Sequence, residues 1–346
     1  FTPANISVVE TLTKTAFLNL SAPAPSGGLT VNLSSSESNI ATAPASVLVP
    51  EGQLSAQVTV TAIAQGSAQI TASPQAGVEA SLGVTVTPAP AINANNLIIG
   101  KDLQNGASIW LGDTPTQPTT VTIEIADPAI AIVSTSATTV GSAIASISNI
   151  ISTSVPQVYI QGLQQGETSY TVSAPGFTPV TRTIEVWPSG FVEFNYSREN
   201  ITLNTTTFSA NTQTTVYPAV LYPADHPQYP LRTYTWGYPI RAGLSVEVVV
   251  TNSNNSVGAV VGSPLSFSGN DSSKTFQFDP LSAGSTTITI EQPDGFVAPT
   301  GGVNWYDNTI DVLVTAPDIL LSSQYVVGKD MQSGINVSLQ SAPPTP

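Results

Sequence analysis

Three segments of the sequence share one pattern, in which alternating apolar residues are interrupted by a short turn with a glycine at a fixed place. Apolar residues occupy every second position before the turn, and the alternation resumes after the glycine. Alternation at a period of two is typical of a strand with one face in a core. We therefore predict a β-hairpin in each segment, and such an internal repeat constrains the architecture of the whole chain. The segments run from Gln57 to Ser73, Gln157 to Ser173 and Thr275 to Glu291, with glycines Gly66, Gly166 and Gly284.

The flanks of these segments repeat as well. Each predicted hairpin is followed by a Pro/Gly turn and a last alternating strand that leads into Pro88, Pro188 or Pro317. Proline cannot donate a hydrogen bond to a sheet ladder, so it ends the strand and stiffens a short joint between domains. The first halves of the first two units also match, as strand, Pro-rich loop, strand, Asn or Asp turn, and short strand.

This density of short strands predicts the fold class. About seven strands per ~100 residues, frequent turn signals and no apolar run at helical spacing are typical of a two-sheet β-sandwich of immunoglobulin type. We expect an all-β chain of tandem immunoglobulin-like β-sandwich domains in an elongated array. The expected domains are 1–88, 89–188 and 189–317, with an aromatic and Pro-rich insertion at 216–243 in the third. Residues 318–346 are expected to supply the first strands of a further domain, either truncated or strand-donating.

A second, longer repeat links the end of the chain to its middle. The stretch "VVGKDMQSGINVSLQSAPPTP" from Val326 to Pro346 resembles "IIGKDLQNGASIWLGDTPTQP" from Ile98 to Pro118, 228 positions earlier. The glycine of each "GKD" is expected to allow a bend where a first strand crosses between sheets. Two interpretations of the final stretch are open. Either the protein continues beyond Pro346, or the strand formed by Ile335, Val337 and Leu339 completes a neighbouring subunit by strand addition.

The stretches "LSAPAPSGGLTVNLSSSESNIATAPASVLVPEGQLSAQVTVTA", "GSAQITAS" and "SAPGFTPVTRTIEVWPSGF" resemble bacterial immunoglobulin-like repeats. Proteins with such repeats are large and either secreted or anchored to the cell surface. The resemblance covers nearly the whole chain and is weakest from Tyr217 to Arg241. It implies a stalk, an adhesin, a cell-envelope layer or a fibre, and it supplies no catalytic residues.

Charge and composition exclude several classes of partner and site. The 22 acidic and 8 basic residues give a formal net charge of −14, so nucleic acid and anionic membranes are disfavoured as partners. The chain has no cysteine, which excludes disulfides and zinc–thiolate sites. No apolar run approaches the ~18 residues that a membrane span requires.

The sequence predicts no enzyme active site. His226 is the single histidine and stands between prolines in "ADHPQ", so we interpret it as a loop residue. Acidic tandem sandwiches often bind Ca²⁺ at their joints through oxygen ligands, and the candidate ligands are Asp307 with Asp311, and Asp102 with Asp330. No Asp-x-Asp-x-Asp-Gly loop is present, and a turn role for Asp102 is favoured over a calcium site.

The insertion at 216–243 concentrates aromatic residues in a chain that is only 7% aromatic. Rigid rings with arginine are favoured at protein interfaces and on sugar-binding surfaces. Three interpretations are open: the insertion covers its own sandwich or the adjoining domain, it binds another protein, or it binds a glycan. The candidate contact residues are Tyr217, Tyr222, Tyr229, Arg232, Tyr234, Trp236, Tyr238 and Arg241.

Two hypotheses for the role follow. The first is a non-enzymatic extracellular structural protein, whose tandem domains build a stalk, sheath or filament from copies of itself or from neighbouring immunoglobulin-like domains. The second is an adhesin or carbohydrate-binding module that uses the aromatic insertion to contact a cell-surface glycan. A coplanar, solvent-facing strip of rings would favour the second hypothesis.

Overall fold

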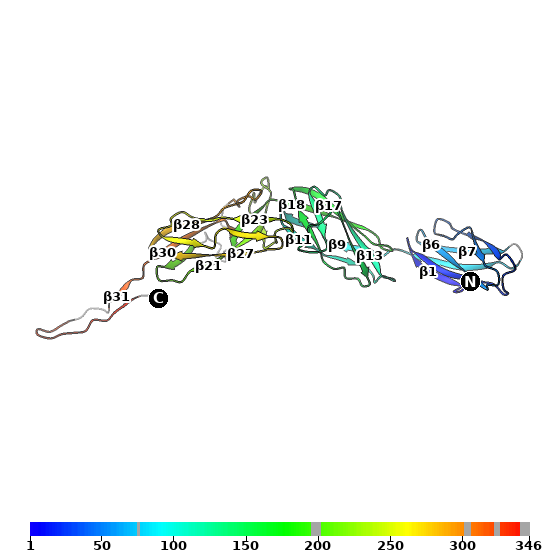
Figure 1. Cartoon of the computed structure of the whole chain (residues 1–346), viewed down its shortest axis with the longest axis horizontal. Coiled ribbons are helices and arrows are strands. Elements are labelled where there is room, and N and C mark those ends of the chain that lie inside the picture. The colour runs from blue at the N-terminus through cyan, green and yellow to red at the C-terminus, as the bar shows by residue number, and fades with distance from the viewer. Residues whose placement is uncertain (75–76, 195–201, 301–305, 322–325, 340–346) are drawn as a thin grey trace.

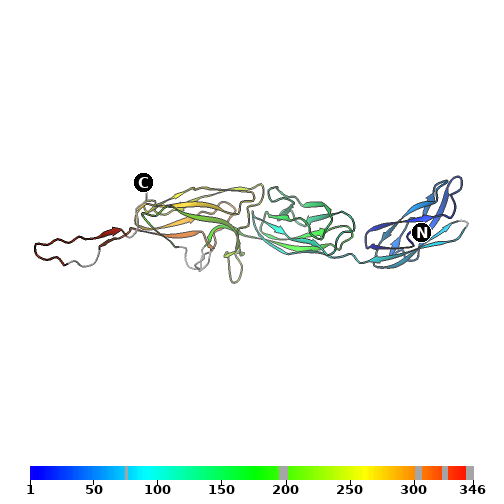
Figure 2. The same ribbon diagram turned by 90° about the horizontal axis from the view of Figure 1, so that it is seen from below.

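The computed structural model describes residues 1–346 except 75–76, 195–201, 301–305, 322–325 and 340–346, and the described part contains strands but no helix. Three β-sandwiches follow one another along an elongated molecule, and a thin strand pair extends beyond the third (Figures 1 and 2). We name them domain 1 (β1 to β8), domain 2 (β9 to β18) and domain 3 (β19 to β30). None of the described residues belongs to a helix that could cross a membrane.

Domain 1 packs a five-stranded sheet on a three-stranded sheet. The first has the order β1-β8-β7-β3-β5 and the second the order β2-β6-β4. Buried positions alternate along each strand, as in β6, so one face of each sheet supplies the core. The strands are β1 (Asn5–Val9), β2 (Thr13–Asn19), β3 (Leu29–Ser35), β4 (Ala41–Thr42), β5 (Ser46–Val49), β6 (Ser55–Ala62), β7 (Gly66–Pro74) and β8 (Ala80–Thr87).

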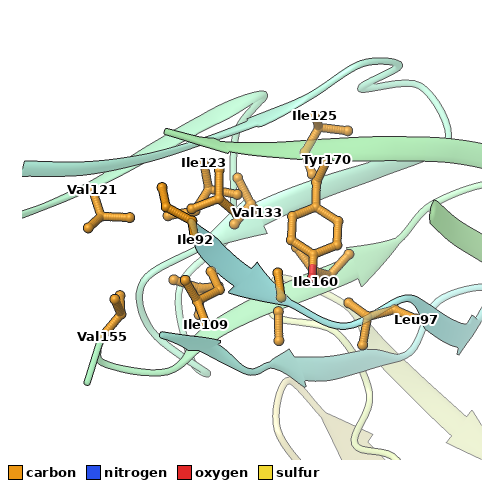
Figure 3. Close-up of a cluster of buried hydrophobic side chains, with 14 of the residues drawn as sticks. Ile92, Leu97, Ile109, Val121, Ile123, Ile125, Val133, Val155, Ile160 and Tyr170 are labelled. Carbon is orange, nitrogen blue, oxygen red and sulfur yellow. The ribbon is translucent and has the colours of Figure 1, made fainter. Parts of the chain in front are cut away.

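Domain 2 repeats this arrangement with the sheets β10-β18-β17-β13-β15 and β11-β16-β14, and adds the pair β9-β12. Its core surrounds the fully buried Tyr170 (Figure 3). The Tyr170 hydroxyl donates to the carbonyl of Asn95 at 2.6 Å. The strands are β9 (Ile92–Ala94), β10 (Leu97–Gly100), β11 (Gln104–Ala107), β12 (Ile109–Leu111), β13 (Thr119–Ile125), β14 (Ala131–Ser134), β15 (Ile144–Ile150), β16 (Val158–Gly162), β17 (Gly166–Ser173) and β18 (Val180–Trp187).

Domain 3 has a sheet of order β25-β27-β21-β19-β29, with β22 also paired to β21, and a sheet of order β20-β30-β28-β24, beside the pair β23-β26. The strands are β19 (Ser189–Phe194), β20 (Thr202–Thr206), β21 (Thr212–Leu221), β22 (Thr233–Trp236), β23 (Ser245–Val248), β24 (Val250–Asn252), β25 (Gly258–Val261), β26 (Leu265–Ser268), β27 (Lys274–Pro280), β28 (Gly284–Ile290), β29 (Tyr306–Asp307) and β30 (Thr309–Thr315). The last pair, β31 (Ile319–Leu321) with β32 (Val337–Leu339), lies beyond this domain.

All three domains share one pairing. A strand near the start of each domain runs parallel to the last strand, as β1 with β8, β10 with β18 and β20 with β30. The other pairs within these sheets are antiparallel. Two packed sheets with this connectivity, repeated three times, make the chain an all-β array of tandem immunoglobulin-like sandwiches.

The prediction of a hairpin at each repeated glycine is wrong. The strands before and after Gly66, Gly166 and Gly284 lie in different sheets of their sandwich, so the turn carries the chain from one sheet to the other. One backbone hydrogen bond holds this turn in all three domains. In domain 1 the N–H of Ile63 donates to the carbonyl of Ile40. Leu163 donates in the same way to Ile130, and Leu281 to Val257.

Glycine is required in this turn for two reasons. Gly66 has a φ of 151° and Gly284 a φ of 155°, which side chains rarely adopt. A Cβ on Gly66 would also lie 2.6 Å from Cδ1 of Ile40, the residue that anchors the turn. The repeated glycine therefore marks a close approach between two layers of the sandwich.

Candidate functional site at the joint between domains 2 and 3

The "GKDLQ" segment, residues 100–104, forms a tight turn between the two sheets of domain 2. Gly100 ends β10, and Gln104 begins β11 in the other sheet. The turn closes when the N–H of Leu103 donates to the carbonyl of Gly100 at 3.1 Å, with Asp102 at a φ of 63°. A Cβ on Gly100 would lie 2.7 Å from Cδ1 of Leu103, so the turn needs glycine for space.

Asp102 connects the two domains through its side chain and its backbone. One carboxylate oxygen, Oδ1, accepts from Nε of Arg241 at 2.9 Å, and Oδ2 contacts Nζ of Lys101. The carbonyl of Asp102 also accepts from the N–H of Arg241 at 3.0 Å. Because Asp102 is buried, these charge-assisted contacts are shielded from water and fix the direction in which domain 3 leaves domain 2.

Leu103 belongs to domain 2 by sequence and to domain 3 by packing. Its side chain is fully buried in the hydrophobic core of domain 3, which also contains Phe191 and Ile240. An isolated backbone bridge pairs Leu103 with Ile240. The two sandwiches therefore share apolar core, and they cannot separate without exposing Leu103 to water.

Two buried glutamine side chains complete the polar part of the joint. Oε1 of Gln104 accepts from the N–H of Ala242 at 3.1 Å and from Nε2 of Gln161 at 3.3 Å. Nε2 of Gln104 donates to the carbonyl of Ala137 at 2.7 Å. Both glutamine side chains are fully buried, and these hydrogen bonds satisfy their amide groups, which would otherwise be left without partners away from water.

The aromatic insertion packs on the end of domain 2. Trp187, the last residue of β18, lies 5.5 Å from Tyr222 and 5.1 Å from Tyr234, measured between ring centroids. Tyr229 stacks on His226 at 5.6 Å, and the guanidinium of Arg232 lies 5.5 Å from the Tyr229 ring centroid. Offset and edge contacts of this kind stabilise a packed cluster.

The remaining candidate residues of the insertion have separate places. Tyr217 is half-buried and packs with Val192, Ala219 and Leu221 on the side of β19 and β21 away from the main core. Tyr238 packs against the core of domain 3, and burial, with Tyr234 nearby, raises its pKa. Trp236 ends β22 and is 39% exposed.

The rings do not form one flat surface. The planes of Trp187 and Tyr234 meet at 65°, and those of Tyr222 and Tyr234 at 80°. This geometry favours the interpretation in which the insertion covers the adjoining domain. Of the eight candidates, Tyr222, Tyr229, Arg232 and Tyr234 lie together in this cluster, and Arg241 lies at the Asp102 turn.

The joint between domains 1 and 2 is built differently. An open cleft of about 410 Å³ lies there, between Leu12 and Thr13 of domain 1 and residues 113–120 and 175–177 of domain 2. Gly176 packs closely on Leu12, since a Cβ at Gly176 would lie 2.7 Å from its Cδ1. Among the described residues, no hydrogen bond links the strands of domain 1 to those of domain 2. Leu12 therefore contacts domain 2 at Gly176, beside an open cleft whose lining includes Asp113, Gln117 and several threonines.

The acidic residues proposed as calcium ligands lie in different surroundings. Asp102 has two cationic partners, whereas Asp330 is exposed. Asp307 accepts from the N–H of Asn308, and Asp311 accepts from the hydroxyl of Thr287. Within the described ranges, no group of three or more His, Cys, Asp or Glu side chains could hold a metal ion.

Glu193 is a half-buried acid on the first strand of domain 3 that the sequence patterns did not single out. It lies on β19, opposite Val216 and Asp307 in neighbouring strands. Burial raises the pKa of its carboxyl to about 7, and Oε2 is buried with no hydrogen-bond partner in the described part of the chain. Such a carboxylate is costly when ionised.

No family model matches the sequence, and the search of curated proteins found no match. Solved structures give weak similarities. The I9–I11 tandem of titin aligns with 90% of this chain and 96% of its own at 8% identity, with a TM-score of 0.32. Domains 4–9 of the surface layer protein SbsC align with 91% of this chain and 45% of their own at 14% identity, with a TM-score of 0.24. The D0–D1 domain of intimin aligns with 64% of this chain and 97% of its own at 9% identity, with a TM-score of 0.22.

Several residues of the joint were missed as functional candidates. Leu103 and Gln104 belong to the repeated "GKD" stretch, and the repeat itself was the signal that could have found them. Trp187 precedes a proline at the end of a strand, where a large aromatic side chain could have been paired with the aromatic insertion. Gln161 carries no local signal.

Proposed function

We propose that this chain is a segment of a non-enzymatic extracellular structural protein of the bacterial immunoglobulin-like type. In this proposal tandem sandwiches build a stalk, sheath or filament on the cell surface. The observation that carries the proposal is the joint at residues 100–104, where Leu103 of domain 2 fills the core of domain 3 and Asp102 binds Arg241. A joint of this kind transmits force from one domain to the next.

The contrast between the two joints supports a rod with one hinge. Domains 2 and 3 share core and buried hydrogen bonds, whereas domains 1 and 2 meet at an open cleft. An extended array of domains with one stiff joint and one flexible joint could serve as a stalk, because it would hold a functional part at a distance from a surface. The predicted partners are other copies of the chain or neighbouring immunoglobulin-like domains.

Assembly by strand addition is the filament form of this proposal. Within the described residues, the strand at Val337–Leu339 pairs with the short β31 alone, and it exposes the side chains of Val337 and Leu339. An exposed edge with apolar side chains is a ready partner for another sheet.

Electron microscopy tests this form, because strand addition predicts that the native protein forms polymers and that a variant with Lys in place of Val337 and Leu339 does not. Monomeric rods that never associate would contradict it.

Protease treatment of intact source cells tests the proposed location. We expect the protein to be digested while a cytosolic marker protein stays intact. Protection of the protein until the cells are lysed would contradict an extracellular role. Microscopy of the released material would then show whether it forms stalks or sheets.

An adhesin or carbohydrate-binding module is the second candidate, because Tyr234 and Trp236 on the insertion are 43% and 39% exposed. Rings with one open face can stack on a sugar. Retention of the protein on cell-surface polysaccharide, compared between Trp236→Ala and the control Trp110→Ala in domain 2, tests it. Loss of retention in Trp236→Ala alone would support glycan binding, and unchanged retention in both would contradict it.

A further inference from the structure

The last turn of the chain has the same backbone conformation as the turn at the joint. In "GKDM" the N–H of Met331 donates to the carbonyl of Gly328 at 3.1 Å, as Leu103 donates to Gly100 at 3.1 Å. Asp330 has a φ of 67°, and Asp102 has a φ of 63°. The second copy of the repeat therefore preserves the backbone conformation of the turn as well as its amino-acid sequence.

The strand pair beside this turn also keeps the register of domain 2. In domain 2, Leu111 of β12 lies opposite Ile92 of β9, and Ile109 lies opposite Ala94. At the end of the chain, Leu339 of β32 lies opposite Ile319 of β31, and Val337 lies opposite Leu321. The chain between β31 and β32 has 15 residues, 322–336, and the chain between β9 and β12 has 14, 95–108, so the one extra residue keeps the apolar positions opposite each other.

The two copies differ in what covers them. In domain 2, Leu103 is 0%, Ala107 1%, Ile109 5% and Leu111 1% exposed. Their counterparts at the end of the chain are Met331, which is 74% exposed, Ile335 at 61%, Val337 at 62% and Leu339 at 44%. Each of these four positions, buried in the first copy, carries an apolar side chain that faces water in the second.

We propose that residues 326–339 form an interaction surface for a second pair of immunoglobulin-like domains of the kind formed by residues 119–317. The strands of a domain 2 sandwich that lacks its own first strands would cover Ile335, Val337 and Leu339. An Arg–Ala loop equivalent to Arg241 and Ala242 would bind the "GKDMQ" turn. The proposal rests on the strand-addition form of the proposed function and deepens it by naming the domains that would cover this edge.

The chemistry of the turn selects this occupant. Asp330 occupies the position of Asp102, which binds an arginine through Oδ1 and through its carbonyl. Met331 occupies the position of Leu103 and is long and flexible enough to enter the same kind of apolar core. Gln332 occupies the position of Gln104, whose Oε1 accepts from the N–H of Ala242. A glycan or a lipid surface would offer no match for this combination of groups.

The experiment extends the chain after Pro346 with a copy of residues 119–317, because Pro346 corresponds to Pro118 and residue 119 then follows in register. Hydrogen exchange of peptide 326–339 is measured in the 346-residue chain and in the extended chain. We expect exchange about 100-fold slower in the extended chain, with part of that protection lost in its Asp330→Ala variant. Rapid exchange in the extended chain, whether or not the added domains fold, would overturn the proposal.

A second variant does not depend on the added domains. Residues 98–111 of the 346-residue chain are replaced by the sequence of residues 326–339. We expect this chain to keep the joint, with hydrogen exchange at residues 240–243 within about threefold of the parent rate. Loss of protection at residues 240–243 in a chain whose domain 2 core remains protected would show that the second turn cannot bind an Arg–Ala loop.

Discussion

Oδ1 of Asp102 accepts a hydrogen bond from Nε of Arg241 at 2.9 Å, although 139 positions separate the two residues in sequence. The acid stands in a turn of domain 2, and the base stands in a loop of domain 3. Lys101 contacts the other carboxylate oxygen, so one acid binds two cations in a place with little water. This contact joins the two sandwiches, which also share apolar core at Leu103, into one packed unit.

Replacing Asp102 with Ala should weaken that unit. Arg241 would lose its carboxylate partner while remaining partly buried, so we expect the free energy of unfolding of domains 2 and 3 to fall by about 2 kcal/mol. Chemical denaturation followed by tryptophan fluorescence measures this change. Asp330→Ala is the matched control, because it alters the same turn in an exposed copy, and its effect should stay within about 0.5 kcal/mol. Equal effects of the two variants would contradict the role of Asp102.

The Leu103→Ala variant should destabilise domain 3, although Leu103 belongs to domain 2 in the sequence. Removing a fully buried leucine side chain leaves a cavity, and we expect a loss of about 2–4 kcal/mol in the free energy of unfolding of domain 3. Hydrogen exchange at β27 and β28 reports on domain 3 directly. Met331→Ala removes a similar side chain from an exposed position and should leave those strands unchanged. Unaltered exchange in Leu103→Ala would show that the shared core does not stabilise domain 3.

Trypsin tests whether Trp187 holds the aromatic insertion in place. Tyr222 and Tyr234 pack on Trp187, so Trp187→Ala should release the insertion and expose the peptide bond after Arg232 to cleavage. We expect cleavage there to be about tenfold faster than in the parent chain. The control is Trp110→Ala, since Trp110 is 48% exposed on domain 2. Resistance to trypsin at Arg232 in Trp187→Ala would mean that the insertion is held by other contacts.

Glu193 should make domain 3 more stable in mild acid. Its folded-state pKa of about 7 lies above the ordinary glutamate value of 4.5, so the folded state binds more protons than the unfolded state between these values. The stabilisation is present below about pH 4.5 and is lost as pH rises through about 7. After allowance for partial solvent screening, we expect a difference of about 1 kcal/mol between pH 5 and pH 8. Glu193→Gln should be more stable than the parent at pH 8 and should lose this pH dependence; an unchanged dependence would contradict the assignment.

The fold class followed from the sequence because strand periodicity is local. Alternation around Val58 and Val60, or around Ile310 and Val312, directly reports which side chains face a core. The sheet to which each strand belongs is not local information. The turn before Gly66 looks like a hairpin turn, and its true direction depends on its anchor to Ile40. For this reason the hairpin prediction failed while the sandwich prediction was confirmed.

The joint was harder to predict than the fold. The repeat drew attention to Gly100 and Asp102, but the burial of Leu103 depends on residues more than 80 positions away, such as Phe191 and Ile240. The aromatic insertion was found by composition alone. Its packing on Trp187 could not be derived from composition, because the direction in which a loop folds depends on the domain beside it.

The most direct test of a stalk with one stiff joint and one hinge is a pair of pulsed electron–electron distance measurements. The chain has no cysteine, so spin labels can be placed uniquely at the exposed positions Thr59, Glu124 and Thr275 after substitution by Cys. The account predicts a narrow distance distribution between the labels on domains 2 and 3, at Glu124→Cys and Thr275→Cys. It predicts a broad distribution between domains 1 and 2, at Thr59→Cys and Glu124→Cys. A distribution across the Asp102 joint as broad as the one across the first joint would contradict it.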